Sequence, residues 1–213
     1  MTPPPTVQFI PAAGGLTLVI HDDFSIGVTG PLSGRTPNIV DNGSNWTTYN
    51  SETYEVNSVS SRVYASNDGT DASKATTLDA GSSTYTVQAI LSSPNWTGSA
   101  RVGVVGFFTN GTDGSETFAK FDLFGGNLRC VEYSSGSASV SQTSALSLTN
   151  NTEYWFDLEV SGQSYTISVL NAARTVTIGT MSGSVSLSAS NVCGLALVAQ
   201  SSSNYCAEFK VYT

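Results

Sequence analysis

A two-residue alternation of apolar and polar side chains runs through most of this chain. In the stretch STYTVQAIL the apolar side is formed by Tyr85, Val87, Ala89 and Leu91. EYWFDLEV and QSYTISVL, further along the chain, alternate in the same way. Because successive side chains of a strand point to opposite faces of a sheet, this period predicts half-buried β-strands. No window of eleven or more residues shows the 3.6-residue period of a helix.

Further strand candidates follow at short intervals and are separated by turn-forming sequences. They are LTLVI, SRVYA, ARVGVVGFFT, ETFAKFDLF, NLRCVEY, RTVTI, CGLALVA and AEFKVY. About a dozen short strands joined by Gly, Asn and Ser-rich turns predict an all-β fold, an antiparallel sandwich or barrel in which each sheet turns one face to the core. VGVVGFF is more continuous, so we expect it at the centre of a sheet, covered on both faces.

Composition excludes two classes of partner. Of the 213 residues 39% are hydrophobic and only 11% are charged, and the formal net charge is −8. An acidic chain without a Lys/Arg cluster repels phosphate backbones, so no nucleic-acid partner is expected. No apolar run approaches the roughly 18 residues of a membrane span, so no membrane partner is expected.

The three cysteines, Cys130, Cys193 and Cys206, are not arranged in a Cys-x-x-Cys motif. Their number is odd, so at least one thiol has no partner within the chain. Two interpretations stay open, because spacing does not reveal pairing: three free thiols, or one disulfide and one free thiol.

The first fifteen residues differ in character from the rest. TPPPT favours polyproline II, and PAAGG is typical of a flexible joint. Between them lie three apolar residues, Val7, Phe9 and Ile10. We therefore predict an extended N-terminal arm over residues 1–15 and one β-sandwich domain over 16–213. Since such a terminus stays disordered unless contacts hold it, the three apolar residues are expected to bind another protein chain.

The chain resembles the concanavalin A-like, or laminin G-like, jelly rolls, in the version found in structural proteins of tailed bacteriophages. The motifs that carry the resemblance are Asp22-Asp23-Phe24, Gly34-Arg35-Thr36-Pro37, Asn42-Gly43 and Trp46 near the start, and Gly194-Leu195 and Phe209-Lys210-Val211 near the end. YWFDLEVSGQSYTISVLN matches a family hairpin, although Ala172 stands where that hairpin has glycine. The resemblance spans residues 20–213 and implies a two-sheet jelly roll whose first and last strands pair.

The stretch HDDFSIGVTGPLSGRTPNIVDNGSNWT is then interpreted as the opening structural segment of the β-domain, and not as a catalytic or metal-binding loop. Asp23, Phe24, Arg35 and Trp46 are expected to have structural roles. Arg35 is predicted to pair with Asp22 or Asp23 and so to hold the long loop in place, and Trp46 is predicted to pack beneath that loop.

Catalytic motifs are scarce. A Ser-His-Asp arrangement would need His21, the sole histidine, which follows an apolar strand candidate. Glycosidases need two carboxylates across the sugar, and the nearest pair is Asp157 and Glu159, on one face of a strand beside Trp155. The Glu-x-Asp-x-Glu run of jelly-roll glucanases is missing. We expect no enzymatic activity and assign no catalytic residue.

Ligand sites are suggested by two tryptophans and two loops. Trp96, in the polar loop SPNWTGS, and Trp155 are candidates for contact with a glycan. The loops Asn67–Asp71 and Asn110–Gly114 carry side chains with hard oxygen atoms, so Ca²⁺ binding by these loops stays an open interpretation. One histidine and three scattered cysteines are a poor supply of zinc ligands, so no cofactor and no metal ligand is assigned.

Three functions are compatible with these patterns. The first is a non-enzymatic virion structural protein of a tailed phage (a capsid decoration, fibre or tail component) that is anchored by its arm to other virion proteins. It would form a homo-oligomer within the assembly, on the virion exterior, and contact surface glycans. The alternative is a carbohydrate-binding, lectin-like module, which would be extracellular. A polysaccharide hydrolase or lyase is the third.

Overall fold

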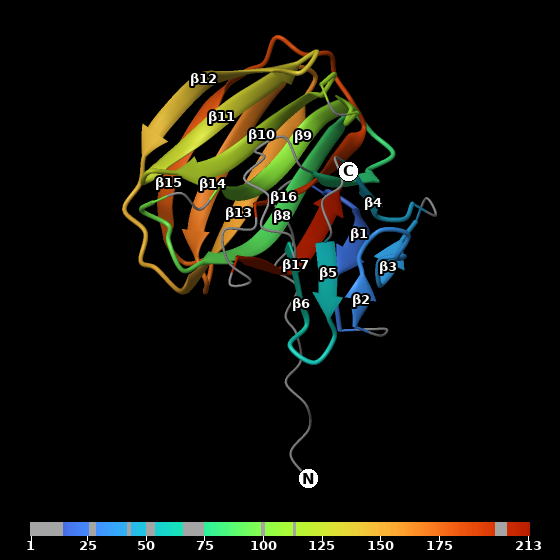
Figure 1. Ribbon diagram of the computed structural model, residues 1–213. Coiled ribbons are helices and arrows are strands. Elements are labelled where there is room, and N and C mark those ends of the chain that lie inside the picture. The colour runs from blue at the N-terminus through green and yellow to red at the C-terminus, as the bar shows by residue number, and fades with distance from the viewer. Residues whose placement is uncertain are drawn as a thin grey trace.

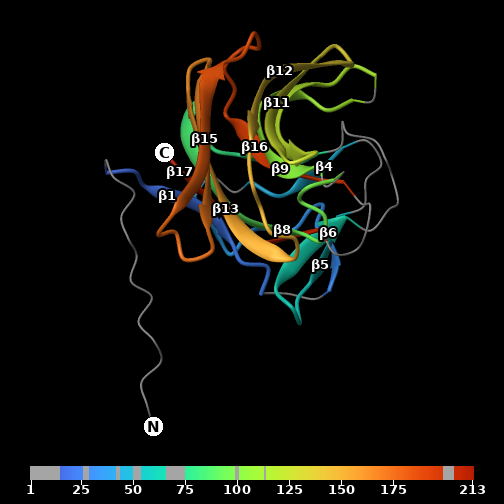
Figure 2. The ribbon, with the colours of Figure 1, turned by 90° about the vertical axis from the view of Figure 1, so that its left-hand side faces the viewer.

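The computed structural model describes residues 15–25, 29–41, 44–49, 54–65, 75–98, 101–112, 114–198 and 204–213. These residues contain strands and turns but no helix, and therefore no helix able to cross a membrane. The strands form two antiparallel sheets that pack face to face (Figures 1 and 2). The predicted all-β jelly-roll sandwich is confirmed.

The larger sheet has the strand order β15-β14-β13-β8-β17-β6-β5-β2, and β1 joins it by pairing with both β17 and β3. Its strands are β1 (Leu18–Asp22), β2 (Gly30–Pro31), β3 (Ile39–Val40), β5 (Tyr54–Asn57), β6 (Arg62–Ala65), β8 (Thr84–Ser93), β13 (Thr152–Ser161), β14 (Ser164–Asn171), β15 (Thr177–Ser184) and β17 (Tyr205–Tyr212).

The smaller sheet has the order β12-β11-β10-β9-β16-β7-β4. Its strands are β4 (Thr47–Thr48), β7 (Thr76–Asp79), β9 (Val102–Asn110), β10 (Thr117–Phe124), β11 (Asn127–Ser134), β12 (Ser137–Ala145) and β16 (Val192–Leu197). Figure 2 shows the two layers from the side, with β15 and β17 in one and β12, β11 and β9 in the other.

The two ends of the domain meet in one strand pair. β1 lies antiparallel to β17, with Asp22 opposite Phe209 (Figure 1). Thr17 and Thr213 exchange backbone hydrogen bonds of 2.8 and 3.0 Å just beyond the pair. The expected pairing of the first and last strands is therefore observed.

The interior of the sandwich is filled by the apolar side chains of the alternating strands. On β8 the side chains of Tyr85, Val87, Ala89 and Leu91 are all buried, as the two-residue period predicts. β9, which contains VGVVGFF, lies between β10 and β16, and seven of its residues in a row are buried. The expectation that this strand is central and covered is confirmed.

All three cysteines are free and buried, which decides between the two interpretations left open by the sequence. Burial raises the pKa of the Cys130 thiol to about 11, and it also raises the pKa of Cys193 and Cys206. They are packing residues of the core in their protonated form.

The opening stretch is organised by one buried carboxylate. Asp22, which is 0% exposed, accepts hydrogen bonds from the Phe24 N–H (3.0 Å), from Arg35 Nη2 (2.9 Å) and Nε (3.2 Å), and from Trp46 Nε1 (2.9 Å). Arg35 thus pairs with Asp22, one of its two predicted partners. Asp23 instead accepts from the backbone and hydroxyl of Ser25.

Phe24 shows how tightly this turn is held. Its φ is 57°, in the left-handed region that bulky residues rarely adopt, and its ring is fully buried. The hydrogen bond from its N–H to Asp22, two residues earlier, closes the turn that imposes this conformation. Trp46 packs between the rings of Phe24 and Phe209, with centroid distances of 6.3 and 5.0 Å.

The outer face of the smaller sheet carries a second buried ionic group. Lys120 and Asp122 are both 0% exposed, and Lys120 Nζ lies 3.1 Å from Asp122 Oδ2. Arg129, opposite Asp122 on β11, donates to both of its carboxylate oxygens at 2.9 Å. Burial lowers the pKa of Lys120, and the nearby Asp122 opposes this shift.

Val7, Phe9 and Ile10 lie outside the described residues. The predicted anchor function of the arm therefore stays a prediction.

Candidate functional site

The outer face of the larger sheet carries two pockets, at opposite ends of the neighbouring strands β8 and β13. The larger has a volume of about 470 Å³, and we call it the Tyr64–Tyr205 pocket. It is lined by Asn57, Ser60, Arg62, Tyr64, Ser92, Asn151 and Tyr205. The smaller, of about 310 Å³, is the hydroxyl pocket. It is lined by Leu16, Thr84, Tyr85, Thr86, Glu159, Val160, Ser161, Ser164, Tyr165 and Thr166.

Strand register builds the floor of the Tyr64–Tyr205 pocket. One row of paired residues crosses five strands, in the order Glu55, Tyr64, Tyr205, Ser92 and Glu153. Because directly paired residues point to the same face, all five side chains lie on the outer face of the sheet. The row places two aromatic rings at the centre and one carboxylate at each end.

Hydrogen bonds connect each tyrosine to the nearer carboxylate. The Tyr64 hydroxyl donates to Glu55 Oε2 at 3.0 Å, and the Tyr205 hydroxyl donates to Glu153 Oε1 at 2.9 Å. The hydrogen bond to Glu55 and partial burial raise the pKa of Tyr64. Burial, opposed by Ser92 and reinforced by Glu153, raises the pKa of Tyr205. Both hydroxyls therefore stay protonated across the physiological range.

The rim of this pocket is formed by the β5–β6 hairpin. Asn57 Oδ1 accepts from the backbone N–H groups of Val59 and Ser60, both at 3.1 Å, which fixes the turn. Arg62, the first residue of β6, places its guanidinium 3.9 Å from the centroid of the Tyr205 ring. Its Nη2 also lies 3.7 Å from Glu153. The pocket thus combines aromatic surface with amide, hydroxyl and guanidinium groups, and carboxylates are bonded to both of its tyrosines.

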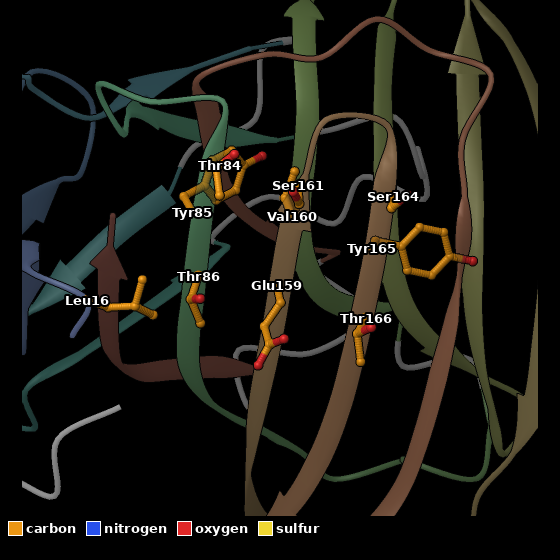
Figure 3. A pocket seen from close by; sticks show the side chains of 10 residues that line it. All are labelled: Leu16, Thr84, Tyr85, Thr86, Glu159, Val160, Ser161, Ser164, Tyr165 and Thr166. Carbon is orange, nitrogen blue, oxygen red and sulfur yellow. The ribbon is translucent and has the colours of Figure 1, made fainter. Parts of the chain in front are cut away.

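The hydroxyl pocket consists of two short rows across β8, β13 and β14. Figure 3 shows Thr86, Glu159 and Thr166 in one row and Thr84, Ser161 and Ser164 in the next. Leu16 projects toward these rows from the side of β17. Within the described residues, Glu159 forms no ion pair, so its carboxylate is available to a ligand.

Between the pockets, Trp155 lies in a packed ionic layer. The ring is only 7% exposed, because the Arg174 guanidinium lies 4.6 Å and the Lys210 ammonium 5.4 Å from its centroid. Its Nε1 donates to the backbone oxygen of Ala172 at 3.2 Å. The prediction that Trp155 offers a face for sugar stacking is corrected, since side-chain cations already cover the ring.

Trp96 also differs from its prediction. It lies in the turn after β8 but is 0% exposed, and its ring stacks on Phe156 at a centroid distance of 5.9 Å. Its Nε1 donates to the backbone oxygen of Thr152 at 2.9 Å. Burial of the apolar indole stabilises the fold, and Trp96 closes one end of the sandwich. Because no part of the ring is exposed, it offers no surface on which a glycan could stack.

Asp157 is an unusual carboxylate in the same layer. Oδ2 pairs with Arg174 and accepts from Gln88 Nε2 at 3.5 Å, while the buried Oδ1 has no hydrogen-bond partner among the described residues. Burial raises the pKa of Asp157 to about 6, Arg174 opposes the shift and Glu159 adds to it. Burial of an incompletely paired carboxylate therefore outweighs the attraction of the cation.

This pKa predicts a specific pH dependence of stability. Between about pH 4, where the unfolded chain loses this proton, and pH 6, the native state binds more protons, so the contribution of Asp157 falls as pH rises. The difference in unfolding free energy between the wild type and Asp157→Asn should drop by roughly 2 to 3 kcal/mol across this window and stay level above it. Urea unfolding at several pH values measures it, with Asp41→Asn as an exposed control.

A difference that rises with pH would contradict this account. Glu208 and Asp23 have lowered pKa values, so they stabilise the protein above those values and contribute the opposite slope. Subtracting the variant curve from the wild-type curve removes their contribution, because both proteins contain them.

The described residues contain no group of three or more His, Cys, Asp or Glu side chains placed to hold a metal ion. The loop Asn67–Asp71 lies outside them, and so does Asp113 of the second loop. In that second loop Asn110 is occupied by local bonds: its Oδ1 accepts from the Thr112 N–H and its Nδ2 donates to the Ser115 oxygen.

Comparison with known proteins shows the fold. No family model matches the sequence, and a search of curated proteins gives no match either. Among solved structures, the chain is similar to the carbohydrate-binding module CBM66 from Bacillus subtilis, with 14% identity, a TM-score of 0.53, and 76% of this chain and 91% of that chain covered.

The chain is also similar to the exoplasmic/lumenal domain of VIP36. In the Ca²⁺-bound form of that domain the identity is 9% and the TM-score 0.57, with 87% of this chain and 88% of that chain covered. In the Ca²⁺/Man-bound form the identity is 10% and the TM-score 0.54, with 86% and 88% covered. At these identities the likeness supports a lectin-like jelly-roll sandwich and leaves the site to be argued from its own residues.

The residues of the Tyr64–Tyr205 pocket were not among the candidates expected from the sequence. Arg62 and Tyr64 lie on a four-residue strand, and Tyr205 lies at the start of the last strand. They meet because β17 lies between two strands here: it pairs with β8 along one edge, and along the other edge Tyr205 pairs with Tyr64 of β6. The only sequence signal for these residues was that each tyrosine occupies a position of its strand that alternation assigns to the outer face of the sheet.

Proposed function

We propose that this chain is a non-enzymatic carbohydrate-binding domain and that the Tyr64–Tyr205 pocket is its primary sugar site. The observation that supports this most is the convergence of two half-buried tyrosines, two asparagines and an arginine in one pocket of about 470 Å³. Ligand pockets of this kind combine aromatic walls with a few fixed polar groups. The similarity to CBM66 and VIP36 favours this function over the virion role.

The chemistry of a sugar fits these groups. The C–H face of a pyranose packs against aromatic surface, and its hydroxyls both donate and accept hydrogen bonds. Asn151 can do both, whereas Asn57 and Arg62 can donate through their side-chain nitrogens. Asn57 Oδ1 is already engaged with the β5–β6 turn. Because Tyr205 and Arg62 are held against each other and against Glu153, the site is formed before the ligand arrives, which lowers the entropic cost of binding.

Hydrolysis is not part of the proposal. A general acid must reach the glycosidic oxygen, whereas Asp157 has Oδ2 paired with Arg174 and Oδ1 buried. Glu55 and Glu153 lie at the ends of a five-strand row, and their backbones are about 19 Å apart at the usual strand spacing. The two carboxylates of a glycosidase are only about 5 to 9.5 Å apart. Incubation with polysaccharides should therefore release no reducing ends.

The test is calorimetric titration with a panel of neutral oligosaccharides built on mannose, glucose, xylose, fructose or galactose. Tyr205→Ala should weaken binding by about 10- to 100-fold, since truncating a central aromatic costs roughly 1.4 to 3 kcal/mol. Tyr205→Phe keeps the ring and loses the bond to Glu153, so a smaller loss is expected.

Tyr212→Ala is the matched control, because Tyr212 lies on the same strand and the same outer face but does not line this pocket. Its affinity should equal that of the wild type. Equal losses in Tyr205→Ala and Tyr212→Ala, or no binding of any sugar in the panel, would exclude this site. Circular dichroism of each variant checks that the sandwich is intact.

A further inference from the structure

We infer that the hydroxyl pocket is a second subsite on the same surface as the Tyr64–Tyr205 pocket, and that one neutral, linear polysaccharide chain occupies both at once. This inference rests on the proposed carbohydrate-binding function. It extends that function from recognition of a sugar to recognition of a polymer.

The placement of the pockets on shared strands supports a linear ligand. On β8, Ser92 lines the Tyr64–Tyr205 pocket and Thr84 lines the hydroxyl pocket. The two residues are eight positions apart, an even number, so they face the same side of the sheet. At about 3.3 Å per residue, a straight chain must span roughly 20 Å to reach from Ser92 to Thr86, at the near side of the hydroxyl pocket, and roughly 26 Å to reach Thr84.

The side chains of the hydroxyl pocket suit a sugar ring. Three threonines and two serines offer hydroxyls that donate and accept, and Glu159 can accept from two sugar hydroxyls. Leu16, 37% exposed, adds an apolar contact for the C–H face of a ring. Figure 3 shows Glu159 in the middle of its row, between Thr86 and Thr166.

The strip between the two pockets is filled rather than hollow. Gln88 and Trp155 are each 7% exposed, and Arg174 covers them by donating to Gln88 Oε1 at 2.8 Å and by lying over the indole. A polymer that follows β8 and β13 therefore passes over a closed layer and enters a pocket at each end.

Charge favours a neutral polymer over an acidic one. The two pockets and the carboxylates bonded to them bring together Glu55, Glu153 and Glu159 against Arg62. In the strip between the pockets the cations Arg174 and Lys210 are paired with carboxylates, those of Asp157 and Glu208, and add no net positive charge. The chain as a whole carries a net charge of −8. Polyuronates would be repelled from such a face, whereas neutral glycans are not.

The experiment is a length series measured by calorimetry. The probes are disaccharides to octasaccharides of mannan, cellulose, xylan, fructan and galactan, with oligogalacturonates as the acidic comparison. In at least one neutral series, affinity should rise at least tenfold once the oligomer spans roughly 20 to 26 Å, because the second contact becomes intramolecular.

The double variant Leu16→Ser/Glu159→Gln should abolish that gain and leave the affinity for the disaccharide unchanged. Both residues are exposed, so the fold is expected to tolerate the changes. Asp41→Asn, which removes an exposed carboxylate outside both pockets, should keep the full gain.

Two results would overturn the inference while the proposed function stands. One is Tyr205-dependent binding whose affinity is the same for short and long oligomers. The other is a length gain that persists in the double variant. Absence of binding in every neutral series would overturn both the inference and the proposed function.

Discussion

Replacing Trp46 with alanine is expected to lower the free energy of unfolding by about 3 to 5 kcal/mol. The indole is 1% exposed and lies against Phe24 and Phe209, so its removal leaves a cavity between the opening loop and the last strand. The same change takes one donor from Asp22, a carboxylate that is fully buried. Denaturant unfolding of the purified variant measures the loss.

Trp46→Phe separates the two contributions. It keeps most of the apolar ring and removes only the 2.9 Å bond to Asp22, so a loss of about 1 to 3 kcal/mol is expected. Sugar binding should be unchanged in both variants at temperatures where they are folded. A destabilisation below about 1 kcal/mol in Trp46→Ala, together with altered ligand affinity, would instead make Trp46 a binding residue.

Asp122→Ala should lower the free energy of unfolding by a similar amount, about 3 to 5 kcal/mol. The carboxylate lies 3.1 Å from the fully buried Lys120 ammonium and accepts two bonds from Arg129. Removing it leaves two cations close together on a covered face without the anion that they share. The midpoint of guanidinium unfolding should fall accordingly.

A double variant tests the electrostatic origin of this loss. Asp122→Ala/Lys120→Met also removes the buried ammonium, so it should be more stable than Asp122→Ala alone. Asp41→Ala, at an exposed carboxylate, should change stability by less than about 0.5 kcal/mol. If the double variant is less stable than the single one, the loss comes from packing and not from removal of the shared anion.

Strands with a strong alternation were predictable, and weakly patterned ones were not. The stretches EYWFDLEV and QSYTISVL are β13 and β14 within two residues. β12, with the sequence SASVSQTSA, was not expected, because it is an edge strand whose one large apolar residue, Val140, is 52% exposed. Without a buried face there is no apolar period to detect.

The candidate site was much less accessible to sequence reasoning. Tryptophans were the natural candidates for sugar contact, yet Trp96 is buried and Trp155 is covered by cations. The residues that do line a pocket, Arg62, Tyr64 and Tyr205, are ordinary members of strands. Their importance comes from cross-strand neighbours, and single-sequence patterns do not specify which strands become neighbours.

The sequence by itself determined the all-β class and the inward face of each patterned strand, and it limited the predicted partner of Arg35 to Asp22 or Asp23, because these depend on local alternation and on a motif near one end of the chain. The tertiary structure decided that Trp46, Arg35 and the Phe24 N–H meet on the single carboxylate of Asp22. It also decided that all three cysteines stay free and that β17 brings Tyr205 beside Tyr64. The physical reason is that strand order and register are set by how the two sheets bury their shared core, which involves contacts between residues far apart in the chain.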